Sequence, residues 1–130
     1  MNIGEVSRKT GVSQRMIRHY EESGLIPAPA RKASGYREYT LADVHRLNFV
    51  RRARDLGISI AEIATLLALW QDRGRASADV KALALSHAAE LQRKAEELQA
   101  MRQTLLALAA HCHGDDRPEC PILEELGGNG

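Results

Sequence analysis

The chain has few aromatic residues, only two cysteines and no long apolar run. Aromatic residues make up 4% of its 130 residues, so a core must be built mainly from Leu, Ile, Val and Ala. No segment approaches the roughly 18 consecutive apolar residues of a membrane-spanning helix. The first residues, Met1 to Glu5, have neither the basic nor the apolar part of a signal peptide. We therefore expect a cytoplasmic protein without a membrane partner, built as one domain or as a small domain with an extension.

Patterns that serve catalysis are also missing from the sequence. It contains no glycine-rich phosphate loop, no pair of carboxylates that we can place in a cleft, and no nucleophile beside a base. It has no internal repeat and no low-complexity segment either. We therefore expect a binding protein and not an enzyme.

The net charge of +1 hides an asymmetry along the chain. Residues 1–57 carry 11 Lys and Arg against 6 Asp and Glu, a balance of +5, whereas residues 58–130 carry 7 against 11, a balance of −4. This division suggests that only the first half meets a polyanion such as nucleic acid. Ordinary solvated surface would give the same counts, so charge alone does not decide the matter.

Helical periodicity and capping residues predict a mainly α-helical chain that begins with two short helices. The first covers residues 2–10 and is followed by a turn at Gly11, and Ser13 is suited to cap the second, over 14–23. Two short helices joined by a three-residue turn with glycine are typical of a helix-turn-helix. The residues expected to face inward are Ile3, Val6, Met16 and Ile17.

Residues 27–39 should leave the helical conformation and form a hairpin, or wing. Pro27, Pro29 and Gly35 all disfavour a helix there, and Gly35 also signals a turn. The run from Tyr36 to Tyr39, with an aromatic residue at each end, suits one arm of this hairpin.

Two further helices are predicted over 41–56 and 60–71, capped by Thr40 and Ser59 and separated by Gly57. Together with the helix-turn-helix and the wing they form the predicted DNA-binding domain, residues 1–71. Their inward-facing residues should be Leu41, Val44, Leu47, Val50, Leu56, Ile60, Ile63, Leu66, Leu67 and Trp70.

A long dimerisation helix is predicted over 77–111, with Ser77 as its cap. Its apolar stripe follows a heptad pattern. A helix of about 33 residues spans roughly 50 Å, which the rest of this chain is too small to cover. We expect it to pair with a second copy in a homodimer, and packing in a bundle within one chain is the alternative.

The second helix of a helix-turn-helix enters the major groove of double-stranded DNA, and a dimer reads two half-sites. Wing residues would contact the phosphate backbone beside that groove. Each arginine alone could be solvated surface, but the helix-turn-helix spacing favours DNA binding. The candidates are Arg15, Arg18, His19 and Tyr20 on the helix and Arg31, Lys32, Tyr36 and Arg37 on the wing.

Cys112 and Cys120 bracket a short loop in the segment 112–130, after the long helix. Thiolates select soft ions such as Cu(I), Ag(I) and Au(I), whereas two cysteines underfill a four-coordinate Zn(II) site. Two thiolates and a monovalent ion leave a charge of about −1 in a loop that we expect to be buried. Pro121 suits the first position of a helix, which would place Cys120 at the N-cap. There the positive end of the helix lowers the pKa of the thiol and offsets that charge.

Other interpretations of the two cysteines stay open. They could form a disulfide, although this is uncommon in a cytosolic chain, or act as a thiol redox sensor. His111 and His113 could join them in a zinc site. The chain as a whole could be a thiol-based metal carrier, but the ordered helix-turn-helix and wing argue against this.

The run from Ile17 to Pro27, IRHYEESGLIP, followed by Arg31 and by GYREY at 35–39, resembles the N-terminal signature of the MerR family of bacterial regulators. The order of the later helices extends this resemblance to the entire chain. It implies a winged helix-turn-helix and an antiparallel coiled-coil dimer. It also implies binding to promoters whose elements are too far apart for RNA polymerase, and an effector that makes the protein bend and untwist the DNA.

The C-terminal part resembles the copper-responsive branch of this family, the CueR and HmrR type. Cys112 and Cys120 match the two metal ligands of that branch, and the flanking loop matches as well. Ser77 also matches, at a position where branches that sense divalent ions usually carry a cysteine. The resemblance implies activation of copper-efflux and homeostasis genes by Cu(I), while His111 and His113 leave the metal selectivity open.

An antiparallel dimer would bring the cysteine loop near the middle helices and Ser77 of the partner subunit. Metal would order the loop and let Ile122, Leu123 and Leu126 dock there, which would change the angle between the two DNA-binding heads. The apo and metal-bound forms should then bind DNA with comparable strength but distort it differently.

Overall fold

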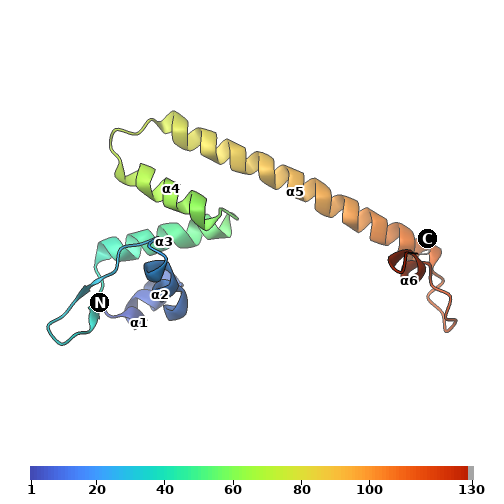
Figure 1. Cartoon of the computed structure of the whole chain (residues 1–130), viewed down its shortest axis with the longest axis horizontal. Helices are drawn as coiled ribbons and strands as arrows, with labels where there is room; N and C mark the ends of the chain where they lie inside the picture. Colours follow the sequence, from blue (N-terminus) through green and yellow to red (C-terminus); the bar gives the residue numbers. More distant parts are fainter. Residues whose placement is uncertain (129–130) are drawn as a thin grey trace. The chain divides into compact units, whose positions relative to one another are not determined.

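A computed structural model of the chain describes residues 1–128, so the last two residues of the predicted segment 112–130 lie outside it. The described chain is helical apart from one two-stranded hairpin, which confirms the predicted fold class (Figure 1). Contacts divide it into a first unit, Met1–Val80, and a second unit that begins at Lys81. The elements are α1 (Ile3–Thr10), α2 (Gln14–Glu22), β1 (Ala30–Arg31), β2 (Arg37–Glu38), α3 (Leu41–Asp55), α4 (Ile60–Gln71), α5 (Ser77–His111) and α6 (Pro121–Leu126).

Local capping chemistry sets the boundaries of α1 and α2. The side chain of Asn2 accepts a hydrogen bond from the backbone amide of Glu5 at 2.9 Å, and Ser13 accepts one from the amide of Met16 at 3.2 Å. Between the two helices Gly11 has a φ of 73°, in the left-handed region that favours glycine. The predicted helix-turn-helix is therefore confirmed.

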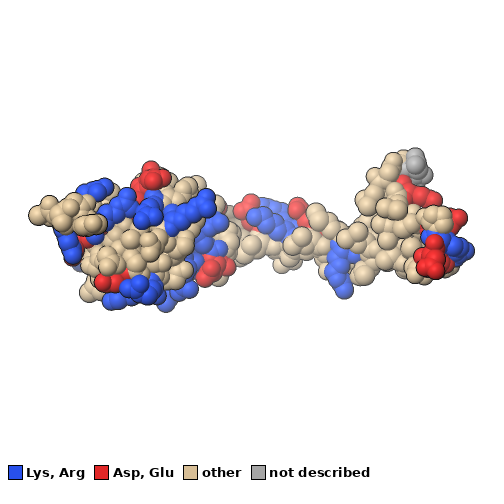
Figure 2. Space-filling model, turned by 90° about the horizontal axis from the view of Figure 1, so that it is seen from below, with Lys and Arg blue, Asp and Glu red and all other residues tan. Residues whose placement is uncertain are grey.

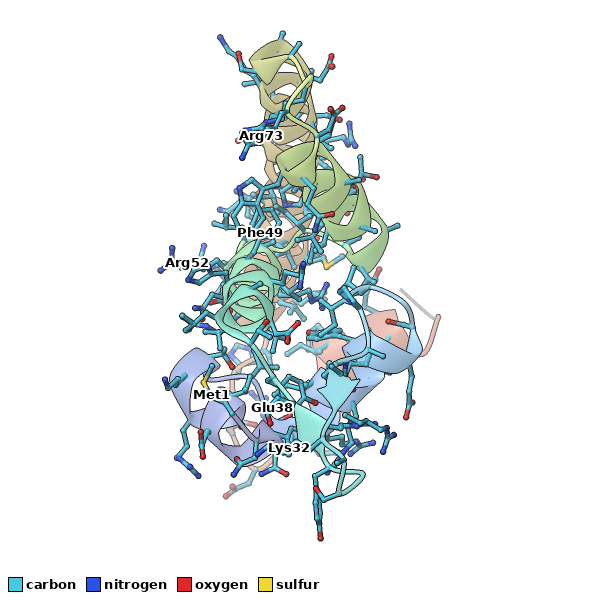
Figure 3. The ribbon with its side chains drawn as sticks, turned by 90° about the vertical axis from the view of Figure 1, so that its left-hand side faces the viewer. Met1, Lys32, Glu38, Phe49, Arg52 and Arg73 are labelled. Atoms are coloured by element: carbon cyan, nitrogen blue, oxygen red, sulfur yellow. The ribbon has the colours of Figure 1, made fainter. Side chains whose placement is uncertain are left out.

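The wing is a short antiparallel hairpin, as predicted. Ala30 pairs with Glu38 and Arg31 with Arg37, and the amide of Gly35 donates to the Lys32 carbonyl at 2.8 Å to close the turn. At its base, the carboxylate of Glu38 lies 3.0 Å from the Lys32 ammonium and 3.4 Å from the amino group of Met1 (Figure 3). These ion pairs hold the hairpin against the start of α1.

Buried aliphatic side chains from α1 to α4 form one core in the first unit, with the rings of Tyr20 and Tyr39 among them. The predicted caps of α3 and α4 are present: Thr40 forms a reciprocal capping box with Asp43, and Ser59 accepts from the amide of Glu62. The buried hydrophobic residues are Val6, Val12, Ile17, Tyr20, Ile26, Tyr39, Val44, Leu47, Val50, Ala53, Ile63 and Leu67.

Four residues that we predicted to face inward are exposed. Met16 is 38% exposed, Leu41 64%, Leu56 65% and Trp70 45%. Leu41 lies in the first turn of α3, whereas Leu56 and Trp70 border an open space between α3 and α4. A second correction concerns Ser77, which is the first residue of α5 and not the cap before it.

α5 is 35 residues long, and none of them is buried in the described chain. Much of its exposed surface is apolar, and contact between such a surface and water is unfavourable. Within residues 1–128, no helix is both long and apolar enough to cross a membrane. The large exposed apolar side chains of α5 are Leu85, Leu91, Leu98, Met101, Leu105 and Leu106.

The core of the first unit can be tested with two substitutions on α3. Leu47 is fully buried and Leu41 is 64% exposed. Leu47→Ala should lower the free energy of unfolding by about 2–5 kcal/mol because it leaves a cavity, whereas Leu41→Ala should change it by less than about 0.5 kcal/mol. Urea denaturation followed by circular dichroism at one protein concentration measures both. Equal losses would contradict this core.

Candidate DNA interface and metal centre

A basic cavity of about 520 Å³ opens between α2 and the wing. Four basic side chains line it, and positive charge suits a phosphate backbone, but Lys32 is paired with Glu38 and Arg37 with Glu21. Lys and Arg side chains gather over the first unit on the face drawn in Figure 2, in line with its positive charge balance. The cavity is lined by Asn2, Ile3, Arg18, Arg31, Lys32, Ser34, Gly35, Tyr36 and Arg37.

Most of the predicted DNA-binding residues are accessible. Arg15, Arg18 and His19 are exposed on α2, and Tyr36 is 76% exposed in the wing. The guanidinium of Arg31 donates to the Gly35 carbonyl at 3.0 Å, so this side chain folds over its own hairpin. The structure therefore brings one arginine of α2 together with the basic residues of the wing.

Tyr20 corrects the prediction for α2. Its side chain is only 6% exposed and belongs to the core, on the same face of the helix as Ile17. Residues three apart on a helix share a face, so the pattern that buries Ile17 buries Tyr20 as well. Tyr20 packs α2 against the core, so its ring is not exposed for a contact with DNA.

A partly buried polar cluster that we did not predict joins α2 to the wing. The carboxylate of Glu21 accepts a hydrogen bond from the Tyr39 hydroxyl at 2.6 Å and another from the Arg37 guanidinium at 2.8 Å. Burial, assisted by Glu21, raises the pKa of Tyr39 to about 12, so the phenol stays a donor. The hydrogen bond with Tyr39 also raises the pKa of Arg37, against the effect of burial. Arg37, predicted to contact DNA, thus already has a partner within the protein.

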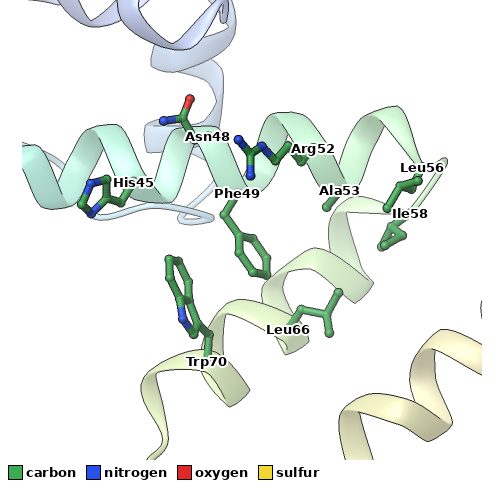
Figure 4. Close-up of a pocket in the computed structure, with 9 residues that line it drawn as sticks. All are labelled: His45, Asn48, Phe49, Arg52, Ala53, Leu56, Ile58, Leu66 and Trp70. Carbon is green, nitrogen blue, oxygen red and sulfur yellow. The ribbon is translucent and has the colours of Figure 1, made fainter.

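An apolar groove of about 580 Å³ lies between α3 and α4 (Figure 4). The rings of Phe49 and Trp70 stack in it, with centroids 4.9 Å apart and planes inclined by 14°. The stack explains why Trp70, although partly exposed, still contributes to packing. The groove is lined by His45, Asn48, Phe49, Arg52, Ala53, Leu56, Ile58, Leu66 and Trp70.

The two cysteines meet in the second unit. α5 ends at His111, so Cys112 directly follows its last turn, while Cys120 is the N-cap of α6 with Pro121 in the first turn, as predicted. Both thiols are free and half-buried, and their sulfur atoms lie 3.9 Å apart. One short loop therefore brings two soft ligands to one place.

The loop between the cysteines corrects another expectation. Its residues, 113–119, are all exposed and not buried. The loop is shaped instead by Asp115, whose carboxylate accepts from the Arg117 amide at 2.9 Å and pairs with its guanidinium at 2.8 Å. These contacts with Arg117 lower the pKa of Asp115. A residual charge on a bound metal would thus lie near water, which stabilises it more than a buried loop would.

The start of α6 acts on the thiol of Cys120. The backbone amides of Leu123 and Ile122 lower the pKa of Cys120, with the first having the larger effect, and the neighbouring Cys112 thiol acts in the same direction. Burial and the carboxylate of Glu124 oppose this shift. The direction of this shift favours the thiolate form of Cys120.

The two histidines next to Cys112 are placed differently. His111 and His113 are both exposed. In the described part of the chain, neither forms a group of three potential ligands with the two thiols. Ser77, the predicted selectivity position, is exposed at the first residue of α5. The structure thus brings together the two predicted sulfur ligands without the histidines.

The lowered pKa of Cys120 gives a prediction about its reactivity. In the Cys112→Ser variant, which leaves one thiol, alkylation by iodoacetamide should have a pH midpoint below the ordinary value of about 8.5, because the amides of α6 stabilise the thiolate. The pH dependence of the alkylation rate measures this midpoint, with the same variant unfolded in urea as control. A midpoint that does not rise on unfolding would contradict the proposed effect of α6.

Comparison with known proteins agrees with this architecture. Two protein-family models match the chain: "MerR HTH family regulatory protein" over residues 1–70 and "MerR, DNA binding" over residues 44–108. The transcriptional regulator HmrR of Sinorhizobium medicae (strain WSM419) is 60% identical over 130 residues, which cover 100% of this chain and 88% of HmrR. CueR of Salmonella typhimurium (strain LT2) is 46% identical over 128 residues, or 98% of this chain and 93% of CueR.

A solved structure is similar over nearly the same length. The regulator PbrR691 from Ralstonia metallidurans CH34, crystallised in complex with lead(II), has a TM-score of 0.84 and 35% sequence identity, and the match covers 97% of this chain and 98% of PbrR691. Family, relatives and fold therefore agree with one another and with the sequence signature. The chain belongs to the MerR family of DNA-binding transcriptional regulators, with HmrR and CueR among its relatives, and it is not an enzyme.

Proposed function

We propose that this protein is a homodimeric, copper-responsive activator that binds promoter DNA and turns on copper-efflux and homeostasis genes when Cu(I) binds to Cys112 and Cys120. The observation that carries the proposal is the pair of free thiols 3.9 Å apart. The two sulfurs share one loop, and the start of α6 favours the thiolate form of one of them.

The number and type of ligands favour a monovalent soft ion. Thiolates select Cu(I), and Ag(I) and Au(I) should bind in the same way, whereas structural zinc sites use four ligands. The hydroxyl of Ser77 is a weak ligand for such ions, so it would not add a third strong donor. PbrR691 was crystallised with lead(II), and by analogy we infer that this chain responds to a heavy metal as well.

Dimerisation and DNA binding would use separate surfaces. The exposed apolar side chains of α5 support pairing with a second copy in an antiparallel coiled coil. Two heads would then place Arg15, Arg18 and His19 in successive major grooves. Arg31 and Tyr36 would contact phosphates next to the grooves, at a promoter where RNA polymerase also binds.

Apolar surfaces support the proposed coupling between metal and DNA. Leu123 and Leu126 of α6 are 68% and 72% exposed. The groove between α3 and α4 is apolar and open, and a second copy could bring its α6 to it. Metal binding would order the loop, favour this docking and so shift the angle between the heads, because only a ligand that prefers one state shifts the equilibrium.

A competition titration of the reduced protein with Cu(I), Ag(I) and Zn(II) tests the metal assignment. Cys112→Ser and Cys120→Ser should each weaken Cu(I) and Ag(I) binding by more than about 100-fold, beyond the 10–100-fold effect of groups that only support a ligand. The His111→Ala/His113→Ala variant is the matched control and should bind Cu(I) like the wild type. Tight zinc binding that survives either cysteine substitution but is lost in the histidine variant would contradict the proposal.

A further inference from the structure

The recognition helix α2 carries a carboxylate on the side that faces the wing. The side chain of Glu21 is only 5% exposed. Its two oxygen atoms accept from two different residues of the wing, Arg37 at 2.8 Å and Tyr39 at 2.6 Å, which follow it by 16 and 18 positions in the sequence. Glu21 therefore links α2 to the wing through contacts between residues that are far apart in the sequence.

A buried carboxylate is unfavourable unless its charge and its lone pairs are matched. Glu21 meets this condition with one cation and one hydroxyl, and both contacts are short, as hydrogen bonds to charged groups are. Tyr39 is itself fixed, because its ring is 3% exposed and its backbone amide donates to the Met1 carbonyl at 2.8 Å. The cluster thus ties α2 to a rigid point at the end of β2.

Simple electrostatics would disfavour an acidic residue here. Glu21, Glu22 and Arg37 line a small cavity beside Arg31, close to the surface that we expect to meet phosphate groups. A carboxylate near phosphates repels them, so its removal should strengthen DNA binding if it had no other role. The pairing with Arg37 and Tyr39 gives Glu21 such a role.

We propose that Glu21 is a positioning residue for DNA binding, which holds the wing at a fixed distance and angle from α2 through Arg37 and Tyr39. Base contacts from α2 and phosphate contacts from the wing then fall in register on one duplex. We call Glu21, Arg37 and Tyr39 the clamp. Arg37 acts mainly within this clamp, and Arg31, Lys32 and Tyr36 contact the DNA backbone. The inference rests on the proposed use of α2 and the wing at DNA.

Two substitutions isolate the clamp, and a third is the matched control. Glu21→Gln removes the charge from the clamp, and Tyr39→Phe removes one hydroxyl without changing any charge. Glu22→Gln removes the same charge from the adjacent position, where the side chain is exposed. The probes are a duplex of the DNA upstream of the protein's own gene and a scrambled duplex of equal length, titrated by fluorescence anisotropy at several salt concentrations.

Glu21→Gln and Tyr39→Phe should each weaken binding to the upstream duplex by about tenfold. The negative slope of log affinity against log salt should become shallower by about 0.9 for each phosphate contact that the wing loses. Glu22→Gln should bind equally well or more tightly. Arg37→Gln combined with Glu21→Gln should be no weaker than either alone, since coupled residues are not additive. Arg37→Lys should bind DNA more weakly than the wild type, because lysine lacks the planar guanidinium.

Circular dichroism and thermal unfolding of each variant show whether the head stays folded, and Tyr39→Phe keeps the buried ring if Glu21→Gln unfolds. The inference is overturned if both variants bind as tightly as Glu22→Gln with an unchanged salt slope, or if Arg37→Lys binds like the wild type. If the wild type still prefers the upstream duplex in these cases, the proposed function stands. A wild type that binds neither duplex overturns both.

Discussion

The apolar stripe along α5 needs a cover, and the proposed homodimer follows from this need. Large apolar side chains of this 35-residue helix are exposed, mostly leucines, and their contact with water is unfavourable for an isolated chain. A second copy that covers this stripe would relieve the constraint and would also present two heads for two half-sites. The same pairing would carry the cysteine loop of one chain toward the head of the other, so a single interface would serve assembly, DNA recognition and sensing.

The DNA-binding head and the cysteine loop differ in how they are held within the chain. The DNA-binding head has a continuous core, and the partly buried cluster of Glu21, Arg37 and Tyr39 fixes its wing. The cysteine loop is exposed and is held mainly by Asp115 and Arg117. This difference would suit the proposed switch, since metal would then order the part of the chain that has fewer contacts.

The sequence predicted what local chemistry determines. Ser13, Thr40 and Ser59 cap their helices through contacts three residues away, and Pro121 sets Cys120 at the N-cap, so short patterns were sufficient. The Glu21 cluster joins residues 16 and 18 positions apart, and no periodicity marks such a pairing. The exposure of Leu41, Leu56 and the cysteine loop depends on how neighbouring elements pack, which an apolar pattern along one helix does not record.

In the proposed function, metal on the two thiols changes the shape of promoter DNA while the protein stays bound. The most direct measurement is energy transfer between dyes at the two ends of the upstream duplex, with the protein bound, before and after addition of Cu(I). We expect the transfer efficiency to change in the wild type but not in Cys112→Ser, with little change in DNA affinity. Release of the DNA by metal, or an unchanged efficiency in a metal-loaded complex, would contradict it.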